Sequence, residues 1–237
     1  MEPLSLSEIS VQQAALKLHD AGVTVIPTLP GGDKKPAFAW KPFTQQAPTR
    51  EQIETWYTDP QRDLGVAVIS GEVSNNLIMV EIEGRGRDAL PQLKKLAEAA
   101  GLEDLWNTAN KGWLELSPSG GVHWFLRCTE HVPGNQKLAQ RPSTPQELAA
   151  WKTEETAKAQ HLEPEMRAKR LAKIEATTAQ QVRQTIAETR GEGGYTVVAP
   201  TPGSHHETGN PWSLLAGGPT TTPTLTPEEL DDFLNLF

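Results

Sequence analysis

The chain has 237 residues, of which 37% are hydrophobic and 22% charged, the composition of a globular protein with a substantial core. Its net charge of −8 argues against a protein that coats DNA through a broad basic surface, although a local basic groove beside bound metal stays compatible with it. The single cysteine cannot form an internal disulfide, and we find neither a signal-peptide pattern nor an apolar run long enough to span a membrane. We therefore expect a soluble protein of the cytoplasm.

Helix and strand patterns alternate in the N-terminal part of the chain. Residues 7–20 have the periodicity of an amphipathic helix, which Gly22 is placed to end, and residues 23–27 predict a short strand. Residues 30–36 are rich in glycine, proline and lysine and predict a basic loop. A capping box at residues 49–52 then opens a short helix that extends through Tyr57.

The middle of the chain predicts further strands around one helix. The strands are expected at residues 64–69, 77–82, 113–116 and 122–127. The helix is expected at residues 89–100, where Gly101 ends it. The last two strands are joined by Ser-Pro-Ser-Gly-Gly at residues 117–121, so they predict an antiparallel pair.

The composition changes near residue 143. Residues 144–147 form a second capping box, and the chain to residue 187 is rich in Ala, Glu, Lys, Gln and Arg, which predicts one or two solvated helices. These helices either contact a template or another protein, or decorate the surface. A strand is expected at residues 195–199, and residues 216–237 predict a Thr/Pro linker and a short terminal helix that lead to a further domain of a longer chain. We thus expect a catalytic domain at 1–215 with a helical insertion at 143–187.

Two acids end the apolar run at residues 78–83. Glu81 and Glu83 are spaced i, i+2, so on a strand both side chains point to the same face while Ile82 points to the core. Neighbouring carboxylates repel each other unless a positive group lies between them, and Mg²⁺ prefers such oxygen ligands. The alternative is an edge strand with two solvated acids.

Motifs in four further segments strengthen the metal hypothesis. They are Pro-Gly-Gly with two lysines at 30–35, Ser-Pro-Ser-Gly-Gly-Val-His at 117–123, Glu-Thr-Arg-Gly-Glu-Gly-Gly at 188–194 and Ser-His-His-Glu-Thr-Gly at 204–209. In this order the motifs resemble the bifunctional primase–polymerase (prim-pol) domain of the archaeo-eukaryotic primase superfamily, found in phage and plasmid replication proteins. The resemblance covers residues 8–212 apart from the helical insertion. It implies an α+β fold with a small N-terminal α/β part and a catalytic part built on an RRM-like antiparallel sheet.

The resemblance also implies a role for each matching residue. Glu81, Glu83 and Glu188 would hold two Mg²⁺ or Mn²⁺ ions. His123 would contact the phosphates of the incoming nucleotide, and Trp124 would face away from the site. The other residues expected at the nucleotide are Lys34, Lys35, Ser119, Gly120, Gly121, Arg127, Arg190, Ser204 and His206.

The acids depart from the family pattern. The family usually has aspartate at the first and third acid positions, where this chain has Glu81 and Glu188. The longer side chain favours Mn²⁺, weakens catalysis, or makes a site that binds without turnover, because Mg²⁺ requires near-ideal octahedral geometry. Glu192 competes with Glu188 for the third position.

The leading functional hypothesis is a template-directed nucleotidyltransferase with DNA primase and DNA polymerase activity. Its expected partners are a single-stranded DNA template, nucleoside triphosphates and a replicative helicase, with no membrane, in the cytoplasm of a phage or plasmid host. Two alternatives are a prim-pol relative that binds nucleotide or DNA without catalysis, and an interaction module that docks a replication partner through the insertion and the terminal helix.

Overall fold

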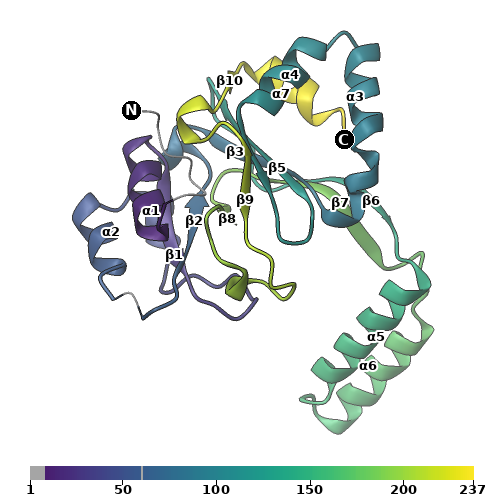
Figure 1. Cartoon of the computed structure of the whole chain (residues 1–237). Coiled ribbons are helices and arrows are strands. Elements are labelled where there is room, and N and C mark those ends of the chain that lie inside the picture. The colour runs from purple at the N-terminus through teal and green to yellow at the C-terminus, as the bar shows by residue number, and fades with distance from the viewer. Residues whose placement is uncertain (1–8, 60) are drawn as a thin grey trace. The chain divides into compact units, whose positions relative to one another are not determined.

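The computed structural model describes residues 9–59 and 61–237 (Figure 1). The chain forms two compact units, one built from the chain up to Leu138 and from Ala187 onward, the other from Ala139–Ile186. The first unit contains two sheets and most of the helices, and it has the mixed α+β architecture that the sequence predicts. Among the described helices, none is long and apolar enough to cross a lipid bilayer.

The smaller sheet belongs to the N-terminal part of the first unit. Its order is β1-β2-β8, with antiparallel pairs between β1 (Thr24–Thr28), β2 (Gly65–Ile69) and β8 (Tyr195–Val197). All residues of β1 and β2 are buried, because α1 (Val11–Asp20) and α2 (Arg50–Trp56) pack beside them. The capping box predicted at the start of α2 is confirmed. The helix expected at 7–20 begins at Val11, and residues 7 and 8 lie outside the described residues.

The larger sheet contains the antiparallel strand pair that the sequence predicts, which is β4 and β5. Its order is β6-β7-β3-β5-β4-β9, and the pairs β3–β5, β3–β7, β4–β5 and β4–β9 are antiparallel. The strands are β3 (Leu77–Ile82), β4 (Trp113–Leu116), β5 (Val122–Cys128), β6 (Lys137–Pro142), β7 (Arg183–Arg190) and β9 (Ser213–Ala216). Short 3-10 helices occur at Lys41–Thr44, Glu72–Ser74, Gly84–Ala89 (η4), Gly203–His205 and Pro219–Thr221.

Helices cover one face of the larger sheet (Figure 1). These helices are α3 (Leu90–Ala99), α4 (Glu103–Lys111) and α7 (Pro227–Leu234). Trp106 of α4 and Phe233 of α7 pack on Trp124 of β5, with ring centroids 5.9 and 6.2 Å from that of Trp124. Since side chains alternate along a strand, His123 lies on the opposite face of β5, away from this aromatic core. The predicted orientation of Trp124 is thereby confirmed.

The C-terminal segment differs from the linker that we expected. The terminal helix is confirmed in α7, and the structure shows a capping box at its start, Thr226. Within the expected linker, however, residues Thr224–Leu225 form β10, which pairs in parallel with the end of β5. Leu225 and Phe233 are buried. This segment is part of the folded core because its apolar residues cover the helical face of the sheet.

The second unit is a helical hairpin. Its helices are α5 (Pro145–Ala159) and α6 (Pro164–Ala176), and the unit also includes most of β6 and the first part of β7. Helix α5 begins at the capping box predicted at Thr144. Ion pairs such as Lys158–Glu154 line its exposed surface. The unit begins at Ala139, four residues before the helical insertion expected at 143–187, because it includes the end of β6, and it ends at Ile186. Neither β6 nor the first part of β7 was predicted as a strand.

Candidate active site

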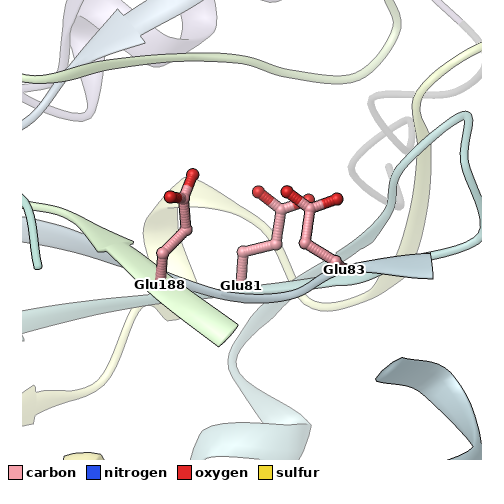
Figure 2. A group of neighbouring side chains, drawn as sticks. All are labelled: Glu81, Glu83 and Glu188. Atoms are coloured by element: carbon pink, nitrogen blue, oxygen red, sulfur yellow. The ribbon is translucent and has the colours of Figure 1, made fainter. Parts of the chain in front are cut away.

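Three glutamates meet on one face of the larger sheet. Glu81, in the central strand β3, lies directly opposite Glu188 of β7, and Glu83 follows two residues later. Figure 2 shows the three carboxylates on the same side of the sheet. One carboxylate oxygen from each residue lies within 4.8 Å of the others. Strand register therefore builds this cluster from residues that are far apart in sequence.

The register extends the row of polar residues across two more strands. Glu81 is opposite His123 of β5, and His123 is in turn opposite Glu115 of β4. The Nε2 atom of His123 lies 3.0 Å from a carboxylate oxygen of Glu81, and both side chains are almost fully buried. Burial opposes charge on both groups, but their mutual attraction and hydrogen bond outweigh it. As a result the pKa of Glu81 is lowered and the pKa of His123 is raised.

The remaining acids have different surroundings. Burial and the negative charge of Glu81 raise the pKa of Glu83, while Arg85 opposes this shift. Glu188 pairs with Arg190, two residues further along β7. The cluster offers only carboxylate oxygens, the donor type that Mg²⁺ and Mn²⁺ prefer. A divalent cation would also relieve the repulsion that raises the pKa of Glu83, so the residues present fit such an ion.

A pocket of about 450 Å³ lies beside Glu81. Lys34, His123 and Arg190 give it a cationic end next to the acid cluster. Its other walls include three aromatic side chains, Trp40, Tyr195 and Trp212. The ammonium group of Lys34 lies 5.8 Å from the ring centroid of Trp212. The pocket thus combines positive groups for an anion with flat apolar walls for a ring system.

The Ser-Gly-Gly turn packs against the end of β3. Gly120 has a φ of +86°, a conformation that favours glycine. A Cβ on Gly121 would lie 2.5 Å from the carbonyl oxygen of Ile82, and one on Gly84 would lie 2.0 Å from that of Ser119. The glycines are required here because two backbone segments approach closely beside Glu83.

A family model described as bifunctional DNA primase/polymerase, N-terminal, matches residues 15–229. The chain belongs to this family. Its function is therefore of the primase/polymerase nucleotidyltransferase type, with DNA and nucleotides as substrates, and enzymes of the family generally use divalent metals. No curated protein sequence matches the chain.

The contacts of two pairs of residues in the prim-pol domain separate alternatives that the sequence left open. Glu188 lies opposite Glu81, whereas a carboxylate oxygen of Glu192 accepts a hydrogen bond from the backbone N–H of Glu72 instead. Lys34 lines the pocket, whereas Lys35 pairs with exposed Asp33 at 2.5 Å. The geometry favours Glu188 as the third acid and Lys34 as the pocket lysine.

The structure places three other residues that were expected at the nucleotide in different positions. His206 stacks edge-on against Trp212 in the pocket wall and is hydrogen-bonded to Thr208. Ser204 holds the basic loop through its carbonyl oxygen, which accepts from the N–H of Gly31. Arg127 donates to the carbonyl oxygen of Ala21 and does not line the pocket. It shares the face of His123, but four residues separate the two by roughly 13 Å along β5, so the structure corrects its assignment.

The sequence did not identify Glu115 or the aromatic walls of the prim-pol pocket. Glu115 is fully buried, and its two carboxylate oxygens accept hydrogen bonds from the indole N–H of Trp113 at 2.8 Å and from the backbone N–H of Ala199 at 3.0 Å. Burial raises its pKa to about 7. A charged residue within the apolar strand Trp-Leu-Glu-Leu was the available signal, since buried acids are rare without partners.

Proposed function

We propose that this prim-pol domain is a template-directed nucleotidyltransferase that synthesises primers on single-stranded DNA and extends them. The observation that carries the proposal is the position of Glu81, Glu83 and Glu188 on one face of the sheet, beside a pocket with a cationic end. Polymerisation needs both parts, because carboxylates hold the metal while cations bind the triphosphate. The resemblance to phage and plasmid replication proteins supports a role in copying such a replicon, together with a replicative helicase.

In the proposed reaction the 3′ hydroxyl oxygen of the growing strand attacks the α-phosphorus of a nucleoside triphosphate. A new P–O bond forms, the bond to the β-phosphate oxygen breaks, pyrophosphate leaves and the hydroxyl proton passes to water. Glu81, Glu83 and Glu188 would hold two divalent ions, which supply charge stabilisation and lower the pKa of the hydroxyl when bound.

The protein's own residues orient the substrates. Lys34 and Arg190, at the cationic end of the pocket, bind the triphosphate oxygens. His123 holds the carboxylate of Glu81 in place through its 3.0 Å contact. The aromatic walls exclude water from the nucleoside and provide flat surfaces for it.

A second candidate function is nucleotide and DNA binding without turnover. It is favoured by the existing partners of the acids, since His123 already binds Glu81 and Arg190 already pairs with Glu188. A metal must compete with these contacts, and glutamate at both positions places its carboxylate one methylene farther from the backbone than aspartate does. Catalysis would then be weak, or would depend on Mn²⁺, whose coordination geometry is less demanding.

Incorporation of labelled nucleotides on a single-stranded template, with and without a primer, tests the proposal in Mg²⁺ and separately in Mn²⁺. We expect products from the wild-type protein and none from Glu83→Gln, because the amide removes a charged metal ligand. Glu192→Gln is the matched control and should retain activity, since Glu192 lies outside the cluster.

Activity retained by Glu83→Gln would refute the metal assignment. If the wild-type protein makes no product in either metal, titration with nucleotide and Mn²⁺ tests the second candidate function, which is binding without turnover. Binding that is lost in Lys34→Gln would establish a site that binds without turnover.

A further inference from the structure

The acid cluster has positive groups on two different sides. Lys34 and Arg190 lie on the pocket side, next to Glu81. On the other side, Glu83 is the residue from which η4 begins, and the N–H of Gly86 donates to the carbonyl oxygen of Glu83 at 2.7 Å. Arg85 of η4 is close enough for its charge to act on the Glu83 carboxylate. A second cationic region therefore begins where the acids end.

The backbone of η4 is held firmly in place. Gly84 is in close contact with the carbonyl of Ser119, and Gly86 is buried. The guanidinium group of Arg87 donates to the carbonyl oxygen of Gly120 at 3.3 Å. Because the first turn of η4 is packed against the Ser-Gly-Gly turn, its exposed arginines are presented beside Glu83.

The following helix, α3, carries two more exposed cations. Lys94 and Lys95 of α3 are exposed, and Lys94 makes a long surface pair with Glu98, at 3.7 Å. We call the two exposed arginines of η4, Arg85 and Arg87, the arginine ledge. The chain as a whole carries a charge of −8, so it repels a polyanion, and a DNA strand can approach the three carboxylates only where local cations offset that repulsion.

We propose that the arginine ledge binds the phosphate backbone of single-stranded DNA and leads the strand to the acid cluster, opposite the nucleotide pocket. The inference rests on the proposed function, which requires a DNA strand at the acids, and it assigns the surface that holds it. Arginine suits this role because its planar guanidinium group contacts phosphate oxygens through two parallel hydrogen bonds. The contacts are with phosphates, so they hold DNA of any sequence.

The test measures DNA binding without catalysis. The full chain is titrated against fluorescein-labelled oligo(dT) in EDTA, and fluorescence anisotropy is followed at several salt concentrations. Arg85→Gln/Arg87→Gln should raise Kd about tenfold or more and reduce the slope of log Kd against log salt by about 1.4, or about 0.7 for each phosphate that no longer has a cationic partner. Arg85→Lys/Arg87→Lys keeps the charge and should retain most of the binding.

The matched control removes the same charge elsewhere. Arg62→Gln/Lys111→Gln changes two exposed cations, in the loop before β2 and on α4, and should alter Kd less than about twofold. An equal weakening of DNA binding in the two double variants would overturn the proposal that the ledge binds DNA, because it would reveal a general effect of the lost charge. Unchanged DNA binding in Arg85→Gln/Arg87→Gln would overturn it as well, and so would a wild-type chain that does not bind oligo(dT) at low salt.

The result separates the ledge from the proposed function. If the ledge variant loses DNA binding while the wild-type protein incorporates no nucleotide, the ledge stands and the polymerase proposal fails. If the wild-type protein incorporates nucleotides and the ledge variant binds DNA normally, the polymerase proposal stands and the ledge fails.

Discussion

The buried carboxyl group of Glu115 makes the stability of the protein depend on pH. Its pKa is about 7 in the folded protein and 4.5 in the absence of burial. One pKa unit corresponds to about 1.4 kcal/mol, so the difference amounts to about 3 kcal/mol. Because the folded state has the higher pKa, it binds the proton more tightly than the unfolded state. This stabilisation is complete below about pH 4.5 and is lost as the pH rises to about 7.

Glu115→Gln removes the titration and adds a constant penalty. The amide has one acceptor oxygen, whereas the structure offers two N–H donors, from Trp113 and Ala199. One buried donor then lacks an acceptor, at a cost of about 1–3 kcal/mol that does not depend on pH. The variant should therefore be clearly less stable than the wild type near pH 5. Between about pH 5 and about pH 8 the difference should shift by about 2.5 kcal/mol in favour of the variant, because at the higher pH the wild-type protein holds a buried charge.

Urea unfolding followed by tryptophan fluorescence, from about pH 5 to about pH 8 in both proteins, measures this difference. Groups such as Glu147, whose pKa is lowered to about 2, contribute to both curves and cancel in the difference. A difference in unfolding free energy that stays constant across this pH range would refute the reasoning, since it would mean that Glu115 does not titrate there.

Two other predictions concern the pocket and the C-terminal segment. Lys34→Gln should raise the KM for nucleotide about tenfold or more, because a charged hydrogen bond to phosphate is removed. The control Lys35→Gln should change this KM less than about twofold. Steady-state incorporation kinetics compare the two variants, and equal effects on KM would contradict the assignment of Lys34. Phe233→Ala should lower the free energy of unfolding by about 3–5 kcal/mol, because Phe233 is fully buried against Trp106 and Trp124. Urea unfolding measures this decrease, and a change below about 0.5 kcal/mol would mean that the segment is a linker after all.

Local signals in the sequence predicted much of the fold. The capping boxes predicted at Thr49 and Thr144 each mark the start of a helix, since the side chain and backbone that form the box are within four residues of each other. The bounds expected for β3 and β4 agree with the structure, because both strands are apolar runs with clear ends. The acids Glu81 and Glu83 could be identified for the same reason: their common face follows from strand alternation alone.

Other features depend on contacts that the sequence does not display. Strand β7 (Arg-Gln-Thr-Ile-Ala-Glu-Thr-Arg) has a composition that suits a helix, and it is a strand because it pairs with β3. The polar, half-exposed strand β6 at the sheet edge gave no alternating pattern. Arg127 was expected at the nucleotide, but it lies at the far end of β5 from His123, since strand alternation gives a side chain its face and not its distance from the site.

The edge of the larger sheet determines how this domain can change during evolution. The chain leaves on β6, forms the helical hairpin and returns on β7, so the hairpin can lengthen or shorten without moving a residue of β3. Within β7 the opposite holds. A single inserted or deleted residue before Glu188 would place Ala187 or Thr189 opposite Glu81 and turn the carboxylate to the other face. Lineages can remodel the hairpin freely, but they must keep the count of residues in one strand.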